Sequence, residues 1–224
     1  MNDKTPSARG ELSGLDRLLS RVDQRLRQFA GKGSGSAQNL ARPSPAHGHD
    51  EPTLSERERE HSAGLMRVNH TGEVCAQALY QGQAVMARSS DTREKLLGAA
   101  QEEADHLAWC ETRLQELDAK PSKLNPLFYA ASFALGAATA MVSDKVSLGF
   151  VHATEERVAN HLRAHLKSLP GEDRKSQLIL QQMLIDEEHH GQEALEHGGE
   201  EFSRPIKDAM SLASQLMTRT TYWI

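Results

Sequence analysis

Two short stretches decide the fold: residues 102–111 read EEADHLAWCE and residues 185–190 read IDEEHH. Each contains the pattern Glu-x-x-His, as Glu103 with His106 and as Glu187 with His190. Residues three apart share one face of an α-helix, so the two side chains of a pair can reach one metal ion. Single pairs of this kind also arise by chance. Their positions relative to the rest of the chain must therefore decide whether they form a metal site.

Two further glutamates complete a larger pattern. Glu73 precedes Glu103 by 30 residues, and the midpoint, residue 88, lies beside the turn-forming Ser89-Ser90-Asp91. Glu155 precedes Glu187 by 32 residues, and the midpoint is Gly171 of the helix-breaking Pro170-Gly171. Two antiparallel hairpins would therefore each bring one glutamate level with one Glu-x-x-His. A four-helix bundle that binds two metal ions uses this set of side chains.

Composition also favours an all-α protein. The chain has 224 residues, enough for one domain with an extension, and 4% of them are aromatic. Alanine, leucine, glutamate and glutamine, which are strong helix formers, are abundant. The net charge of −5 provides no basic surface, so we expect no nucleic-acid partner. The two cysteines, Cys75 and Cys110, form no metal-binding spacing and no disulfide framework, which predicts a reducing compartment.

The chain divides into an extension, residues 1–53, and a helical domain, residues 54–224. Within the extension, apolar residues at helical spacing predict a short amphipathic helix over 11–30, and Gly, Ser and Pro predict a flexible linker over 31–53. The domain is expected to contain helices at about residues 55–88, 91–117, 172–197 and 204–218, and an uncharged segment at 127–142. A further helix is expected to pass through Glu155 and Leu166 and to end at Pro170-Gly171. No secretory signal is expected at the N-terminus.

The candidate ligands are four carboxylates and two imidazoles: Glu73, Glu103, His106, Glu155, Glu187 and His190. This donor set suits iron or manganese better than zinc or copper. Each residue has a structural alternative, because glutamates on helices are usually solvated and His106 would also fit a buried core. In IDEEHH, Asp186 with His189 is a second register that the spacing disfavours only slightly. A third Glu-x-x-His, Glu58 with His61, has no partner at matching depth and is interpreted as chance.

Histidine ligands usually donate their second ring N–H to an acceptor. Asp105, directly before His106, and Asp186, near His190, are the candidates for this role. His161, six residues after Glu155, is a candidate for facing the cluster or a substrate, with a surface histidine as the alternative.

Five segments resemble the demethoxyubiquinone hydroxylase family, in its bacterial branch: MRVNHTGEVCAQALYQGQ (66–83), EEADHLAWCE (102–111), LNPLFYAASFALGA (124–137), GFVHATEERVANHL (149–162) and IDEEHH (185–190). The resemblance covers about residues 55–224. It implies a ferritin-like bundle with two iron ions and an O₂-dependent monooxygenase that hydroxylates the ring of a demethoxyubiquinol in ubiquinone biosynthesis. All six positions match the family's iron ligands, with Glu103 and Glu155 as bridging ligands, and the match favours Glu187 with His190. His161 also matches a family histidine.

The uncharged segment gains a role from this resemblance, because the substrate carries a prenyl tail that dissolves in a bilayer. Phe128, Phe133 and Leu135 are the candidate residues for membrane contact and substrate access, in a helix that lies in the membrane interface. A buried bundle helix is the alternative. We expect a peripheral protein on the cytoplasmic face of the cell membrane, with other ubiquinone-biosynthesis proteins or a second copy of the chain as candidate partners.

Two other functions use the same residues. Iron storage or peroxide scavenging uses the same six-ligand plan, but a soluble protein of that kind does not need the uncharged segment. A non-catalytic scaffold for quinone synthesis would tolerate loss of the ligands, whereas an enzyme would not.

Overall fold

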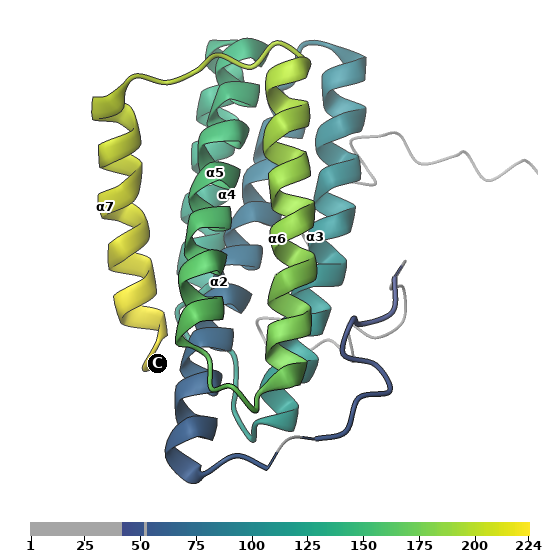
Figure 1. The fold of residues 1–224 in the computed structure, drawn as a ribbon. Helices are drawn as coiled ribbons and strands as arrows, with labels where there is room; N and C mark the ends of the chain where they lie inside the picture. Colours follow the sequence, from purple (N-terminus) through teal and green to yellow (C-terminus); the bar gives the residue numbers. More distant parts are fainter. Residues whose placement is uncertain (1–41, 52) are drawn as a thin grey trace, which may run out of the picture. The chain divides into compact units, whose positions relative to one another are not determined.

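The computed structural model describes residues 42–51 and 53–224, which all belong to one compact unit, Gly35–Ile224. These residues form six α-helices and no β-strand (Figure 1). The all-α prediction is therefore confirmed. The predicted helix over residues 11–30 lies outside the described residues, as does the predicted linker up to residue 41.

Four helices form the bundle as two hairpins: α2 (Glu56–Met86) with α3 (Ser90–Glu116), and α5 (Asp144–Ser168) with α6 (Arg174–Glu196). Both predicted turns separate the helices of a hairpin. The Ser89 side chain caps α3 by accepting a hydrogen bond from the backbone N–H of Thr92. Asp173, just after Pro170-Gly171, caps α6 in the same way. Short polar N-caps thus begin the second helix of each hairpin where the midpoint argument requires.

The uncharged segment is a separate helix, α4 (Asn125–Val142), which packs along α2 and carries the chain from one hairpin to the other. The two backbones approach closely at paired glycines. A Cβ atom on Gly82 would lie 2.1 Å from the carbonyl oxygen of Phe133, and one on Gly136 would lie 2.2 Å from that of Leu79. Ser143 then ends α4 and caps α5, so α5 begins directly at the far end of the bundle.

The bundle core contains two apolar clusters with a polar layer between them. The first cluster includes Met66, Trp109, Leu162 and Met183. The second includes Tyr80, Leu96, Val151 and Ala194. Every helix of the bundle contributes to both, and the residues between them in sequence on each helix include the predicted ligands.

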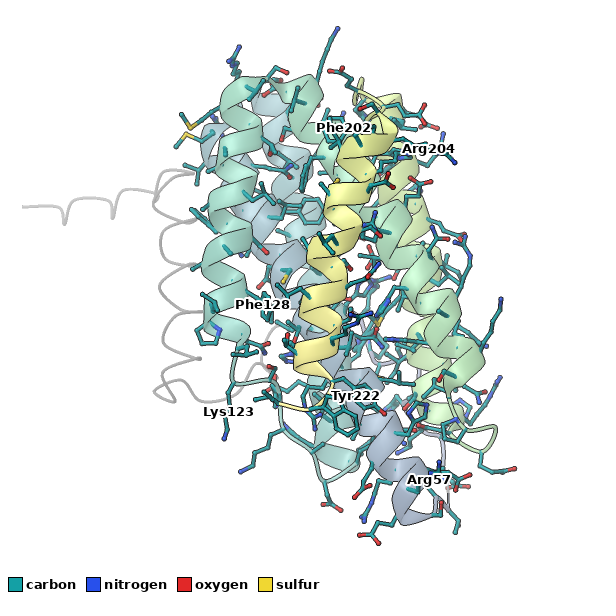
Figure 2. The ribbon with its side chains drawn as sticks, turned by 90° about the vertical axis from the view of Figure 1, so that its left-hand side faces the viewer. Arg57, Lys123, Phe128, Phe202, Arg204 and Tyr222 are labelled. Carbon is teal, nitrogen blue, oxygen red and sulfur yellow. The ribbon has the colours of Figure 1, made fainter. Side chains whose placement is uncertain are left out.

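The last helix, α7 (Arg204–Thr221), lies against α2 and α5 and runs from Arg204 to the Tyr222 end in Figure 2. Its polar face points inward. Arg157 of α5 donates hydrogen bonds to the Ser211 hydroxyl and to the Lys207 carbonyl, both at 2.7 Å. Lys207 also donates to Glu156 at 2.8 Å. The helix is three residues longer than the predicted 204–218, and its orientation was not expected from the sequence.

Residues 42–51 lie within the predicted flexible linker but pack on the bundle. Ala46 is 7% exposed and joins the first apolar cluster. Glu51 accepts two hydrogen bonds from the buried Arg113, at 2.8 and 3.0 Å, and pairs with Lys175 at 2.9 Å. The composition of this stretch correctly indicates a segment without regular structure. It does not reveal the distant partners that the segment contacts, namely Arg113 and Lys175.

Candidate metal centre

The six candidate ligands lie together in the polar layer, and none of them is more than 5% exposed. They come from all four bundle helices: Glu73 from α2, Glu103 and His106 from α3, Glu155 from α5, and Glu187 and His190 from α6. Each helix has apolar residues above and below its ligand, so the burial of those residues carries the polar side chains into the interior.

The distances describe a cluster around the two Nδ1 atoms. His106 Nδ1 lies 3.1 Å from Glu103 Oε2, 3.3 Å from Glu187 Oε1 and 3.5 Å from Glu73 Oε2. His190 Nδ1 lies 3.3 Å from Glu103 Oε1 and 3.7 Å from Glu187 Oε2. Glu103 and Glu187 therefore each place one oxygen beside each imidazole. This fits the predicted shared role of Glu103, whereas the bridging role of Glu155 stays a prediction.

The donor set fits metal binding. One atom from each of Glu73, Glu103, His106 and Glu187 lies within 4.8 Å of the others. Several buried atoms of the cluster have no hydrogen-bond partner, namely Glu73 Oε2, Glu103 Oε1, Glu155 Oε2, both oxygens of Glu187, and His190 Nδ1. Buried polar groups nearly always have partners, and charged ones are very costly without them. Bound cations would satisfy these atoms together.

The electrostatics of the protein alone lead to the same conclusion. Burial, together with repulsion from neighbouring carboxylates, raises the pKa of Glu73 and Glu155 well above the ordinary value. Burial would also favour neutral Glu103, but the charge of His106 outweighs it and lowers the pKa of that carboxyl. The carboxylates raise the pKa of both His106 and His190 against the opposing effect of burial. The cluster thus attracts positive charge strongly, as protons or as metal ions.

Comparison with known proteins identifies the family. Residues 60–221 match the sequence model of the family described as "Ubiquinone biosynthesis protein COQ7". The chain belongs to the COQ7 family. It is 54% identical over 215 residues to 3-demethoxyubiquinol 3-hydroxylases of Pseudomonas fluorescens and Azotobacter vinelandii, covering 95% of this chain and 97% of each relative. It is 52% identical over 221 residues to the protein of that name from Pseudomonas aeruginosa, covering 97% of this chain and 100% of the relative.

In this COQ7-family chain, a carboxylate holds the outer nitrogen, Nε2, of each histidine. The arrangement is crosswise, because the histidine on α3 is held by a carboxylate from α6 and the histidine on α6 by one from α3. His106 Nε2 lies 2.9 Å from Asp186 Oδ2, and His190 Nε2 lies 3.1 Å from Glu102 Oε2. A carboxylate at Nε2 holds a proton there and leaves Nδ1 for a metal. Asp186 was a candidate for this role, but Glu102 was missed. The signal was present, because both motifs place an acidic residue directly before the ligand glutamate.

Tyr80 is a second residue that sequence reasoning missed. It is 1% exposed, and its hydroxyl donates a hydrogen bond of 2.5 Å to Glu155 Oε1. It follows Glu73 by seven residues, about two helical turns, so its position on the ligand face of α2 could have been noticed. Burial and the surrounding carboxylates raise its pKa well above the ordinary value, so the hydroxyl keeps its proton and holds Glu155 in place.

Two candidates lie elsewhere. Asp105 is buried and pairs with Arg42 at 3.5 Å, and a role for it beside a motif histidine stays a prediction. His161 lines a cavity of about 400 Å³ between α5 and α7 that includes none of the six candidates. Its ring centroid lies 3.9 Å from that of His165, and burial lowers the pKa of both, that of His165 to about 3. A role for His161 at the cluster stays a prediction.

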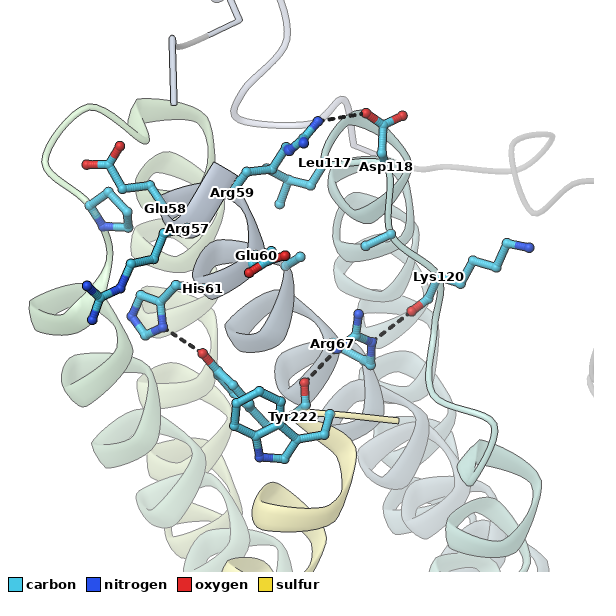
Figure 3. A pocket seen from close by; sticks show the side chains of 14 residues that line it. Arg57, Glu58, Arg59, Glu60, His61, Arg67, Leu117, Asp118, Lys120 and Tyr222 are labelled. Atoms are coloured by element: carbon cyan, nitrogen blue, oxygen red, sulfur yellow. Dashed lines mark hydrogen bonds and ion pairs between the residues drawn. The ribbon is translucent and has the colours of Figure 1, made fainter. Parts of the chain in front are cut away.

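The remaining Glu-x-x-His serves the structure. Glu58 completes the capping box of α2 with Ser55, and His61 Nδ1 lies 2.7 Å from the Tyr222 hydroxyl. Both line a surface pocket of about 1100 Å³ where α2 begins (Figure 3). This pocket contains none of the six candidates, so its size does not mark it as the site of chemistry. His189 of the alternative register is exposed, with 67% of its side chain accessible.

Proposed function

We propose that the protein is a di-iron monooxygenase that hydroxylates the ring of a demethoxyubiquinol with O₂. One observation carries the proposal. The buried carboxylate and histidine cluster occurs in a chain that is 52–54% identical, over nearly its full length, to proteins named 3-demethoxyubiquinol 3-hydroxylase. The names describe the relatives, and the cluster gives this chain the side chains that such chemistry needs.

Each histidine would hold one iron ion. His106 and Glu73 would bind the first, His190 would bind the second, and Glu103, with an oxygen beside each imidazole, would contact both. A pair of ferrous ions held by these residues would supply the two electrons that hydroxylation with O₂ requires. The apolar clusters on either side exclude water from this layer. Tyr80 keeps one oxygen of Glu155 oriented while the other faces the cluster without a protein partner.

The quinone content of cells tests the assigned substrate. Cells that lack this gene are expected to accumulate demethoxyubiquinone and lose ubiquinone, measured by mass spectrometry beside wild-type cells. Reintroducing the gene should restore the profile, which controls for effects on neighbouring genes. A normal quinone profile in the deletion strain would overturn the assigned substrate and bring iron storage and peroxide scavenging forward.

We further propose that α4 lies in the membrane interface. By length and composition it is the one helix, among those of the described residues, that could cross a membrane, and only 22% of it is buried within the protein. Its 18 residues span about 27 Å, slightly less than the roughly 30 Å hydrocarbon core. Because α4 is packed along α2, it cannot cross a bilayer without the bundle. This packing favours contact between the membrane interface and the exposed side of α4, where Leu127, Leu135 and Met141 lie.

The orientation of α7 supports a membrane-facing surface that α7 would share with α4. With its polar face against α5, it leaves apolar residues exposed, including Leu212 at 71%, Leu216 at 66% and, beyond its end, Trp223 at 80%. Figure 2 views the side on which α4 and α7 both face the reader. Amphipathic helices with an aromatic residue at one end are typical of membrane interfaces. We place this surface on the cytoplasmic face of the cell membrane, where the prenylated substrate would reach it.

Charging α4 is expected to release the protein from membranes. Leu127→Glu with Leu135→Glu replaces two exposed leucines, and each buried leucine is worth about 1.5–3 kcal/mol, so partition should weaken at least about tenfold. The measurement is co-sedimentation with anionic lipid vesicles. The matched control is Ile185→Glu on α6, which is 60% exposed but lies outside both helices. Equal sedimentation of the double variant and the wild type, or equal release by the control, would contradict the interface.

Phe133, predicted from the sequence, is a poorer target because it is half-buried and stacks on Tyr129.

A further inference from the structure

The segment formed by residues 42–51, called here the arm, places Arg42 beside the metal cluster. Arg42 Nη1 lies 2.9 Å from Asp186 Oδ2, and its Nε lies 3.5 Å from Asp105 Oδ2. One guanidinium group thus spans carboxylates on α3 and α6, and each carboxylate is adjacent in sequence to a candidate ligand. Arg42 Nη2 also lies 3.3 Å from His106 Nε2.

Several contacts fix the position of Arg42. Its guanidinium carbon lies 5.0 Å from the centre of the Trp109 ring, a cation–π distance. The Trp109 indole N–H donates to the Arg42 carbonyl at 3.4 Å. Further along the arm, Ala46 is buried in the first apolar cluster, and Glu51 pairs with Arg113 and Lys175. The arm is therefore attached at both ends, and Arg42 is held over the α3 and α6 side of the bundle.

This contact makes the two halves of the crosswise arrangement different. Asp186, which holds His106, also forms an ion pair with Arg42 and accepts a hydrogen bond from Gln182 at 3.0 Å, and its side chain is 12% exposed. Glu102, which holds His190, has a side chain that is 51% exposed. The carboxylate behind His106 is thus held by three groups, whereas its counterpart behind His190 faces solvent.

We infer that Arg42 is a positioning residue for the metal site, acting through Asp186 on His106 and so on one of the two metal positions. The inference rests on the di-iron site proposed above. The guanidinium holds Asp186 at the hydrogen-bond distance that orients the imidazole of His106. A lysine keeps the charge but lacks the planar fork that spans two carboxylates.

Metal titration tests the inference with a readout separate from activity. The probe is Co²⁺, an air-stable substitute for Fe²⁺, added to the full-length metal-free protein and followed by calorimetry and by the visible absorption of bound cobalt. Wild type is expected to bind two ions. Arg42→Gln should bind one of them roughly tenfold more weakly, within the 10–100-fold range for loss of an outer partner, with a changed cobalt spectrum. Arg42→Lys should recover part of the affinity.

Two further variants test whether the effect is specific to Arg42 and whether it depends on the arm. Arg59→Gln removes an arginine from an exposed ion pair with Asp118 at the end of the bundle and should leave metal binding unchanged. Ala46→Glu should detach the arm and reproduce the weaker binding. If the wild type binds two ions and Arg42→Gln binds both equally well, the inference is overturned while the metal site stands. If the wild type binds no metal, the proposed site fails and this inference fails with it.

Discussion

Glu187→Ala is expected to abolish ring hydroxylation and to reduce the metal content of the purified protein. Glu187 has an oxygen 3.3 Å from His106 Nδ1 and another 3.7 Å from His190 Nδ1, and neither oxygen has a hydrogen-bond partner in the protein. Its loss therefore removes a candidate ligand from both metal positions. The fall in turnover should exceed roughly 100-fold, the upper range for losing an outer partner of a ligand.

The measurement is the amount of hydroxylated product formed per molecule of iron-reconstituted protein, together with the iron content of the protein. Glu188→Ala is the matched control, because Glu188 is the next residue along α6 but is half-exposed and paired with Arg163. Thermal unfolding separates loss of function from loss of fold. The charge of Glu187 contributes to the raised pKa of Glu73 and Glu155, so the metal-free variant should be at least as stable as metal-free wild type. Full turnover by Glu187→Ala would remove the basis for the proposed site.

Gly136→Ala is expected to destabilise the protein, although alanine is the better helix former. The added Cβ atom would lie 2.2 Å from the Leu79 carbonyl oxygen, so the backbones of α2 and α4 must separate. Overpacking of this kind costs about 1–3 kcal/mol, with the upper end expected here because the obstacle is backbone. In contrast, Gly98 in α3 is exposed, and a Cβ atom added there would have no atom within 4 Å. Gly98→Ala should therefore gain about 0.5–1 kcal/mol.

Urea denaturation of both variants gives the difference in free energy of unfolding, with the wild type as reference. The two substitutions are chemically identical and both occur in helices, so opposite signs isolate the close helix contact from helix propensity. Equal stability of the two variants would mean that α4 does not pack on α2 at the described distance. The interface proposal for α4 would then lose its structural argument.

The sequence predicted the parts of the fold and site that depend on local signals. Ser89 and Asp173 cap their helices through nearby backbone groups, so the hairpin turns could be located from the order of the residues alone. Once the turns were located, helix periodicity was sufficient to bring Glu73 level with Glu103, and Glu155 level with Glu187. The six side chains accordingly lie together in the interior of the bundle.

The missed features depend on partners far away in sequence. Tyr80 lies 75 residues from Glu155, and Arg42 lies 144 residues from Asp186, so no local pattern connects them. Glu102 is different, because its position before Glu103 mirrors that of Asp186 before Glu187, and only the crosswise pairing had to be recognised. The inward polar face of α7 could not be predicted from amphipathicity alone, since a helix of this kind usually buries its apolar face.

The passage of the chain through α4 also has a consequence for synthesis. α2 packs on α3 and α4, its neighbours in sequence, so the N-terminal half can assemble while later residues are still being translated. That half carries Glu73, Glu103 and His106, whereas Glu155, Glu187 and His190 emerge afterwards. A nascent chain would thus present three of the six ligands in a preformed layer before the others exist. Under the proposed function, the complete metal site would therefore form only after α6 has left the ribosome.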